Sequence, residues 1–600
     1  MNTSKLKSPY SFLAIIITSL VLVLLTFVYY PKWKKDRTEA TISWDVSGYY
    51  FYLPSIFIYK DLKKVGFKQK IQDQYSPASS SYQTYTFANG NEVMKYSGGM
   101  ALIYSPFFGL GHIGAKLMGA PKDGFSKPYQ LAIAIQSVLI AILGLLLARL
   151  ILLRYFTDHV TALALISIAL ATNYLEYASI SGAMTHNYLF TIYTAVILLT
   201  IRYYDKPGAG GAITIGALCG LAVLVRPTEM IIVFIPLLWN INLSDWKSRV
   251  EHFIKRKQHV AGFLLGAIPV GFIQMAYWQY VTGHWFVYSY EEQGFNWLNP
   301  HLIKGLFNTR AGWFVYSPIM ALSLIGFYHL WRHKRFLFAA IGIVSFFGMY
   351  INFAWDQWTY GGSLGQRALI QLYPVLMFAL AAFYEQMLKN KWSKYLLYII
   401  ISACLYLMVW WVHQAHLGRY FVPGEVNTKY LANVIGKWHF DRDYYKLLDK
   451  TDIYKGVVNN PDRIYQNDFE IGPFEGCVSE GIQSEKGICV SQDAPWSPLI
   501  SIPTSNRCGD WIRTQVKVYT PEKEWEIWKM GQMVVKFLRG EQVVKDNMIR
   551  IHRIMNHGET RTLFIDSDVR NLQLDMIQVQ FWNPGSNKKV VIDDLEVFCF

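Results

Sequence analysis

Residues 130–153 read QLAIAIQSVLIAILGLLLARLILL, an apolar run interrupted by a single charged residue, Arg149. A helix needs roughly 20 apolar residues to cross a hydrocarbon core of about 30 Å. The run therefore predicts a transmembrane helix. Similar runs precede and follow it, and together they decide the fold class of the chain.

The composition agrees with a protein that crosses a membrane many times. Of its 600 residues, 52% are hydrophobic, 16% are aromatic and only 16% are charged, which is too apolar for an ordinary soluble protein. The first run, 11–30, has no small-residue cleavage site after Tyr29 and Tyr30. We therefore expect it to remain as the first helix rather than to be removed as a secretory signal.

About eleven spans are expected within a transmembrane domain that covers residues 1–413. The long apolar runs lie at 11–30, 130–153, 160–178, 187–204, 259–280, 312–331, 336–354, 368–387 and 395–413. Two shorter runs, 210–225 and 229–242, flank the dipeptide Arg226-Pro227. The stretch 99–118 is also apolar. As a further span it would invert the orientation of everything after it, and we expect it instead to form a helix at the membrane interface.

Lysine and arginine in the short loops set the predicted orientation, because positive charge is retained on the cytoplasmic side. With the N-terminus inside, the basic loops near 154, 202–206, 247–257, 332–335 and 389–394 all become cytoplasmic. The large loop 31–129 and the C-terminal region then lie outside. We accordingly expect a multi-pass protein of a bacterial-type cytoplasmic membrane with its C-terminal domain in the periplasm.

The chain changes character after residue 413. A mixed connector at 414–465 leads to alternating stretches such as TQVKVYTP and MIQVQFW, which predict an all-β domain over residues 466–600. In an exported domain, four cysteines permit two disulfides in any of three pairings, and free buried thiols are the alternative. The four are Cys477, Cys489, Cys508 and Cys599.

The formal net charge of +15 does not indicate nucleic-acid binding, because much of it lies in loops beside anionic lipid. The sequence contains no phosphate-binding GxxxxGKS/T loop, no HExxH motif and no exported CxxC pair. An ATP-driven pump and a zinc protease therefore lack their usual residues. No internal repeat is evident that would favour a secondary transporter.

The unusual polar residues fall in the predicted outer connections. Ionisable groups at membrane depth are costly and therefore indicate function. Guanidinium groups bind phosphate well, and a carboxylate can accept the proton of a hydroxyl or amine nucleophile. The pattern predicts a site for a lipid-linked substrate, with these candidate residues: Asp45, His186, Arg226, Glu291, Glu292, Arg310, Asp356, Trp358, Tyr360 and Arg367.

Each candidate also has a purely structural alternative. Asp45 can cap a nearby helix or pair with the basic residues at 32–37. Arg367 can anchor a helix end at the membrane interface, and Arg226 can pair with Glu229. The remaining candidates can be ordinary interfacial or solvated residues.

These residues resemble a known family, the GT-C superfamily of membrane-embedded glycosyltransferases, and in particular its protein mannosyltransferases and lipid A aminoarabinose transferases. The resemblance covers roughly residues 10–415. It rests on Asp45 after the first helix, on the Arg226-Pro227 turn, on the block LFNTRAGWFVYSP, and on the block WDQWTYGGSLGQR that ends in Arg367.

The resemblance implies an inverting, metal-independent transfer of a sugar from a polyprenyl-phosphate donor to a glycolipid, glycan or protein, without a cofactor. In that scheme Asp45 is the general base, Arg367 and Arg226 hold the donor phosphate, and His186 assists the acceptor or the leaving phosphate. Protein mannosyltransferases typically carry an Asp-Glu pair, whereas here Val46 follows Asp45. The sugar and the acceptor therefore stay open.

The C-terminal region has a resemblance of its own. NDFE at 467–470 and VVIDDLEVFCF at 590–600 resemble the first and last strands of a jelly roll of the carbohydrate-binding-module kind. This implies a structural role or a calcium site for Asp593 and Asp594. A sugar-binding role rests on analogy alone, and a spacer or docking module fits equally well.

Two other classes of function remain open for the membrane domain. A non-enzymatic flippase or scaffold for lipid-linked glycans would use the same arginines for phosphate but would need no base. A transporter would need a substrate cavity that opens alternately to both membrane faces.

Overall fold

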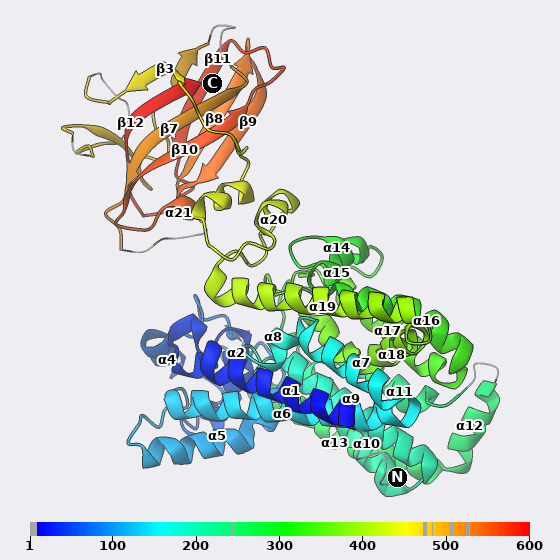
Figure 1. The fold of residues 1–600 in the computed structure, drawn as a ribbon. Coiled ribbons are helices and arrows are strands. Elements are labelled where there is room, and N and C mark those ends of the chain that lie inside the picture. The colour runs from blue at the N-terminus through cyan, green and yellow to red at the C-terminus, as the bar shows by residue number, and fades with distance from the viewer. Residues whose placement is uncertain are drawn as a thin grey trace. The chain divides into compact units, whose positions relative to one another are not determined.

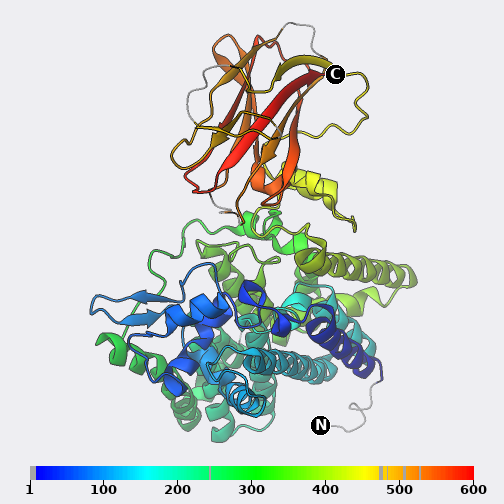
Figure 2. The same cartoon turned by 90° about the vertical axis from the view of Figure 1, so that its left-hand side faces the viewer.

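The structure is a computed structural model that describes residues 9–241, 245–471, 477–482, 484–504, 509–523, 525 and 529–600. The chain divides into two compact units, Met1–Gly424 and Glu425–Phe600. Figures 1 and 2 show a helical first unit and a second unit built mainly of strands. The predicted order of a helical region followed by a region of β-sheets is thus confirmed.

The first unit consists mainly of helices. Their bounds are α1 (Pro9–Leu24), α2 (Asp45–Tyr50), α3 (Tyr52–Phe57), α4 (Lys68–Tyr75), α5 (Gly99–Leu117), α6 (Lys127–Tyr155), α7 (Asp158–Leu170), α8 (Tyr174–Ala178), α9 (Thr185–Asp205), α10 (Ala209–Val225), α11 (Phe234–Leu238), α12 (Trp246–Lys255), α13 (Lys257–Thr282), α14 (Leu302–Phe307), α15 (Trp313–Tyr316), α16 (Ala321–His333), α17 (Arg335–Ala354), α18 (Tyr373–Met387) and α19 (Lys391–His413).

Within the described part of the chain, six helical stretches are long and apolar enough to cross a membrane. They are Pro9–Lys34, Lys127–Tyr155, Lys257–Thr282, Arg335–Ala354, Arg367–Met387 and Lys391–Gly418. Three further apolar helices are shorter, namely Asp158–Leu170, Ala209–Val225 and Pro227–Leu238. The expected count of about eleven spans is therefore not confirmed.

The difference arises where the expected spans are broken or polar. In the run 312–331, α15 ends at Tyr316 and α16 begins only at Ala321, because Pro318 cannot continue a regular helix. The run 160–178 is split between α7 and α8. Helix α9 has sufficient length, but buried polar residues such as Thr185 and Asn187 lower its hydropathy. Such irregular helices are tolerated where the surrounding protein satisfies their polar groups.

Exposed apolar side chains mark the faces that fit a lipid environment. On α1 they include Leu13, Ile16 and Leu20, and α13 exposes a similar row. Helix α18 differs from both, because every residue from Tyr373 to Tyr384 is buried. We therefore place α18 at the centre of the first unit and the outer faces of α1 and α13 against lipid.

Helices α10 and α13 approach each other closely through glycine. A Cβ atom on Gly216 would lie 2.0 Å from the carbonyl oxygen of Phe263, and one on Gly266 would lie 2.1 Å from that of Ile213. Small residues at such positions allow membrane helices to pack backbone against backbone. This contact fixes α10, and with it the position of Arg226 at its C-terminal end.

The loop 31–129 is well structured. It contains the 3-10 helices Lys32–Lys34 and Arg37–Glu39, helices α2 to α5, and a hairpin of β1 (Thr84–Thr86) and β2 (Glu92–Met94). The predicted helix at 99–118 corresponds to α5, which packs against α6. Its membrane depth stays a prediction.

The second unit contains two antiparallel sheets that enclose a common hydrophobic core (Figures 1 and 2). One sheet has the order β10-β7-β12-β5-β4, with β3 also paired to β12, and the other has the order β6-β11-β8-β9. The bounds are β3 (Asp462–Asn467), β4 (Cys477–Ser479), β5 (Gly487–Val490), β6 (Ile500–Pro503), β7 (Trp511–Tyr519), β8 (Gln532–Arg539), β9 (Gln542–Arg550), β10 (Thr560–Asp568), β11 (Met576–Trp582) and β12 (Val590–Cys599).

Residues alternate between buried and partly exposed positions along the central strands, as on β7 and β11. This period of two is what the sequence pattern predicts for a strand with one face on a core. The jelly-roll connectivity stays a prediction. The mixed connector contributes α20 (Thr428–Val434) and a 3-10 helix, Arg442–Leu448, to the second unit.

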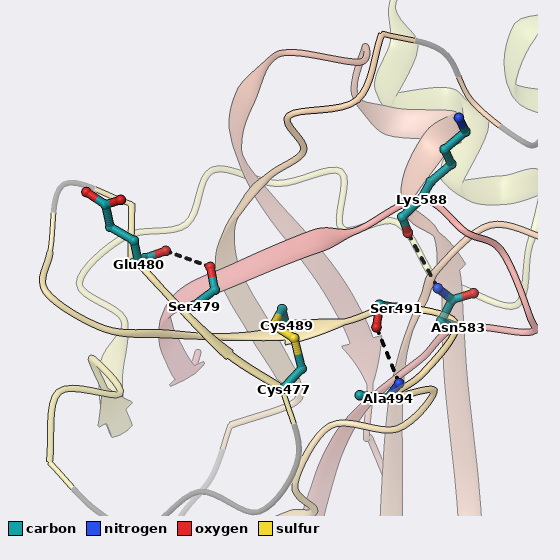
Figure 3. The surroundings of a disulfide bond; sticks show 8 residues. All are labelled: Cys477, Ser479, Glu480, Cys489, Ser491, Ala494, Asn583 and Lys588. Atoms are coloured by element: carbon teal, nitrogen blue, oxygen red, sulfur yellow. Dashed lines mark hydrogen bonds between the residues drawn. A yellow bond between two sulfur atoms is a disulfide. The ribbon is translucent and has the colours of Figure 1, made fainter.

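A disulfide joins β4 to β5. Cys477 and Cys489 are directly opposite each other in the antiparallel register, with their Cα atoms 5.0 Å apart, and Figure 3 shows the bond. This bridge is one of those that the three possible pairings allowed. Cys508 lies outside the described residues, and Cys219 and Cys404 are buried free thiols in the first unit.

Candidate functional site

Asp45 is held at the start of a short helix by a strained backbone. It is the first residue of α2, and the preceding Trp44 has a φ of 49°, which is unfavourable for any residue with a bulky side chain. Tyr360, in the block WDQWTYGGSLGQR, has a φ of 50°. Strain of this kind tends to concentrate at functional sites, where the surrounding structure enforces it.

The carboxylate of Asp45 has three side-chain partners. Its Oδ2 atom lies 2.7 Å from Nη2 of Arg367, and its Oδ1 atom accepts hydrogen bonds from Tyr96 at 2.7 Å and Tyr82 at 3.0 Å. About a fifth of the Asp45 and Arg367 side chains is exposed, 21% and 19% respectively. Both groups are therefore enclosed but still reachable from solvent.

These partners determine the charge of Asp45. Burial raises the pKa of Asp45. The positive charge of Arg367 and the hydrogen bonds from Tyr96 and Tyr82 lower it by more, so the pKa lies below its ordinary value. Asp45 is accordingly a carboxylate at neutral pH. The two tyrosines stay protonated, since burial and the nearby carboxylate raise the pKa of Tyr96 and of Tyr82.

A turn rich in glycine brings Arg367 to Asp45. Gly362 and Gly365 have φ values of 75° and 67°, a conformation that favours glycine. Glycines before a candidate phosphate-binding arginine could make room for a ligand. The structure instead places Gly362 against Pro423 and Gly365 against Tyr316, so the space is filled by the chain itself.

Arg226 approaches the same region from the end of α10. Its guanidinium carbon lies 5.8 Å from the centroid of the Tyr360 ring, close enough for a cation–π interaction. The charges of Arg226 and Arg367 both act on Tyr49 and on Tyr360. The two guanidinium groups thus share one neighbourhood with Asp45.

Both arginines carry a buried N–H group that has no hydrogen-bond partner among the described residues. The atoms are Nη1 of Arg226 and Nε of Arg367. A buried donor without a partner costs about 1–3 kcal/mol, so it calls for an explanation. An anion bound to either guanidinium group would satisfy its free donor.

His186 belongs to a buried polar network close to the two arginines. Its Nδ1 atom lies 3.1 Å from Oε1 of Gln371, whose amide donates to Glu229 at 3.0 Å, and Tyr193 donates to the same carboxylate at 2.7 Å. The sequence offered Glu229 as a structural partner of Arg226. The described residues show no ion pair between Glu229 and Arg226. The Glu229 carboxylate accepts hydrogen bonds from the neutral side chains of Gln371 and Tyr193 instead.

The remaining candidates divide into two groups. Tyr360 is buried beside Arg226, and its hydroxyl donates to Asn352. The ring of Trp358 lies 6.2 Å from His301, and no described contact joins it to Asp45. The exposed candidates are also without a described contact to Asp45, Arg226 or Arg367, and they are Glu291, Glu292, Arg310 and Asp356.

Sequence reasoning missed the tyrosines that surround the carboxylate. Tyr82 and Tyr96 bind it directly, and Tyr290 lies near both Asp45 and Arg226. Burial, opposed by the charge of Arg226, raises the pKa of Tyr290 to about 12. The chain has 40 tyrosines, and no local pattern distinguishes these three from those of the membrane interface.

In the part of the chain that the structure describes, no group of three or more His, Cys, Asp or Glu side chains is placed to hold a metal ion. Asp593, suggested for a calcium site, accepts hydrogen bonds from the backbone of Ile482 and from Ser484. Asp594 forms an ion pair with Lys517. Both aspartates therefore have structural partners within the β unit.

Comparison of the sequence with protein-family models gives no match, and comparison with curated proteins gives none. Among solved structures, the chain is similar to an oligosaccharyltransferase of Archaeoglobus fulgidus, with 11% identity and a TM-score of 0.41 over 73% of this chain and 59% of that one. It is also similar to ArnT of Cupriavidus metallidurans, with 13% identity and a TM-score of 0.39 over 72% and 70% of the two chains.

A third similar structure is the arabinosyltransferase EmbB of Mycobacterium smegmatis, with 10% identity and a TM-score of 0.39 over 96% of this chain and 64% of that one. The chain thus spans less than two thirds of the oligosaccharyltransferase and of the arabinosyltransferase. Similarities this distant do not assign a reaction.

Proposed function

We propose that the protein is a membrane glycosyltransferase that moves a sugar from a polyprenyl-phosphate donor to a hydroxyl or amine acceptor. The observation that carries the proposal is the contact of Arg367 with the carboxylate of Asp45, together with one buried donor on Arg367 and one on Arg226 that have no partner among the described residues. Arginine binds phosphate through several parallel donors, and a carboxylate within reach of the acceptor can remove its proton.

The proposed reaction is a single displacement. The acceptor oxygen or nitrogen forms a bond to the anomeric carbon of the donor, while its proton passes to Asp45. The bond between the anomeric carbon and the phosphate oxygen breaks, and its electron pair leaves with the polyprenyl phosphate. Arg226 and Arg367 stabilise the negative charge that develops on this leaving group.

His186, Gln371 and Glu229 form a hydrogen-bonded network near the two arginines. Tyr82 and Tyr96 fix the orientation of the Asp45 carboxylate. The resemblance to GT-C enzymes implies that no metal ion is needed, and this remains an expectation. The acceptor class, whether glycolipid, glycan or protein, and the periplasmic location of the site are part of the same proposal.

The proposal is tested by assaying the full-length protein in proteoliposomes with a panel of polyprenyl-phosphate sugars and an extract of envelope glycans. Release of free polyprenyl phosphate, measured by mass spectrometry, is the expected result with one of the donors. Release must depend on Asp45, and an Asp45→Asn protein that remains folded should release none. The same panel assayed in EDTA tests the expectation of a metal-independent reaction.

The runner-up function is a flippase or scaffold for lipid-linked glycans. It is consistent with the ion pair between Asp45 and Arg367, because a purely structural carboxylate would be paired in this way. An Asp45→Asn variant with full cellular function, together with an inactive Arg367→Ala variant, would favour it over the enzyme.

A further inference from the structure

Along one edge of the Arg367 guanidinium group, only one of the two nitrogen donors has a hydrogen-bond partner among the described residues. In any arginine, Nε and Nη2 point in the same direction and can donate to two oxygens of one anion. Arg513 illustrates this in the second unit, where Nε and Nη2 donate to the two carboxylate oxygens of Asp566 at 2.7 and 3.0 Å. At Arg367 only Nη2 is engaged, by Asp45, and Nε is buried without a partner among the described residues.

A two-oxygen anion that binds this edge of Arg367 needs Nη2 as well as Nε. Asp45 occupies Nη2 through a single oxygen, Oδ2, at 2.7 Å. A phosphate bound in the bidentate manner of the Arg513 pair would therefore have to take Nη2 from Asp45. Donor phosphate and carboxylate compete for the same hydrogen-bond donor.

The other side of the carboxylate is anchored independently of Arg367. Tyr96 and Tyr82 both donate to Oδ1, and they come from the loop that contains the β1–β2 hairpin. Tyr49 on α2 and Tyr290 in the segment after α13 also lie near Asp45. All four of these groups are neutral phenols. The positive charge that lowers the pKa of Asp45 comes from Arg367.

We propose that the donor phosphate displaces Asp45 from Nη2 of Arg367, and that Asp45 becomes a competent base only in the donor-bound protein. This inference rests on the proposed function and adds an order of events to it. A carboxylate that loses an ion-pair partner becomes a stronger base. Tyr96 and Tyr82 keep the freed carboxylate in place through Oδ1, so Oδ2 becomes available to the acceptor's proton.

The test uses the full-length protein in lipid nanodiscs, with farnesyl phosphate as the probe and isothermal titration as the measurement. Replacing Asp45 with Asn removes the competitor from Nη2. We expect the dissociation constant of farnesyl phosphate to fall about tenfold in Asp45→Asn relative to the unmodified protein. Asp45→Ser serves as a second variant with the same expectation if the first does not fold.

Two controls separate competition from a general change of charge. Glu229→Gln also removes a nearby negative charge, but Glu229 forms no described bond with Arg367, so its effect should be clearly smaller. Arg367→Lys abolishes the shared edge, because an ammonium group has no such pair of fixed donors. In the Arg367→Lys background, Asp45→Asn should therefore change the affinity by less than about threefold.

The outcomes distinguish the inference from the proposed function. If the unmodified protein and all variants fail to bind farnesyl phosphate, the phosphate site itself is wrong, and both proposals fall. If the unmodified protein binds the probe but Asp45→Asn binds it no more tightly, competition is refuted and the phosphate site stands. An equal gain in Glu229→Gln also refutes competition, because charge alone would then explain the effect.

Discussion

Nη2 of Arg367 lies 2.7 Å from Oδ2 of Asp45, although 322 residues separate the two in sequence. The first loop of the chain and the turn before α18 therefore form one site. Asp45 is charged because of this contact and of its two tyrosine partners, and Arg367 keeps one buried donor free.

Replacing Asp45 with Asn should reduce sugar transfer by about 10²–10⁴-fold, the range expected for loss of a general base. The amide can still accept the hydrogen bonds of Tyr82 and Tyr96, so the variant should fold. The measurement is turnover in proteoliposomes together with the thermal unfolding temperature. Unchanged turnover would remove Asp45 as the base.

Replacing Arg226 with Ala should raise KM for the donor at least about tenfold, because a charge-assisted hydrogen bond to phosphate is lost. Arg226→Lys should recover part of this loss, since it restores the charge without the planar group. Arg332→Ala is the matched control, because Arg332 is exposed at the end of α16. An equal effect in the control would point to surface charge rather than to the site.

The pH dependence of transfer should reflect the lowered pKa of Asp45. Because kcat/KM reports the free enzyme, its acid limb should lie below the ordinary carboxyl pKa of 3.8. A group with a depressed folded pKa also contributes stability above its unfolded pKa and loses it as pH falls through the folded value. The double variant Tyr82→Phe, Tyr96→Phe removes two donors, so both transitions should move to higher pH. Profiles that coincide with the unmodified protein would contradict the role of these tyrosines.

Gly365 and Gly361 form a matched pair for testing the turn before Arg367. Both have positive φ values, 67° and 70°, so Ala at either position should cost about 1–2 kcal/mol. Only at Gly365 would the new Cβ meet another atom, Cβ of Tyr316 at 2.8 Å, whereas nothing lies within 4 Å at Gly361. Gly365→Ala should therefore show the lower unfolding temperature and the greater loss of transfer. Equal losses would show that the Tyr316 contact does not matter.

The disulfide between Cys477 and Cys489 should stabilise the β unit. Its sequence separation of 12 residues corresponds to about 2–3 kcal/mol on the loop-entropy scale. The double variant Cys477→Ser, Cys489→Ser should lower the unfolding transition of this unit in calorimetry of the full chain. Val478→Ala is the control, because Val478 lies between them in sequence on β4 and is 49% exposed.

The fold class could be predicted from the sequence because long apolar runs and strand alternation are local signals. Helix continuity could not be predicted equally well. Inside a bundle, a helix such as α16 can start late after Pro318, and α9 can carry polar residues that other helices cover. Counting apolar residues does not reveal which helices are enclosed by protein and which face lipid.

The candidate site shows the same division between local and non-local information. Asp45, Arg226 and Arg367 stood out because ionisable residues are rare near apolar helices, and the structure brings these three together. Glu291 and Arg310 stood out for the same reason, yet they are exposed. Tyr82 and Tyr96 did not stand out, because their importance comes from a register that only the folded loop establishes.

The separation of Asp45 from Arg367 also has a consequence for how the protein is made. At a translation rate of about 5–20 residues per second, the ribosome needs roughly 15–65 seconds to reach Arg367 after it has passed Asp45. Throughout that interval the first loop is already synthesised while the arginine that pairs with its carboxylate does not yet exist. A nascent or truncated chain that ends before Arg367 therefore cannot assemble the site, and coexpressed halves divided within the loop after α13 would have to meet in the membrane to restore it.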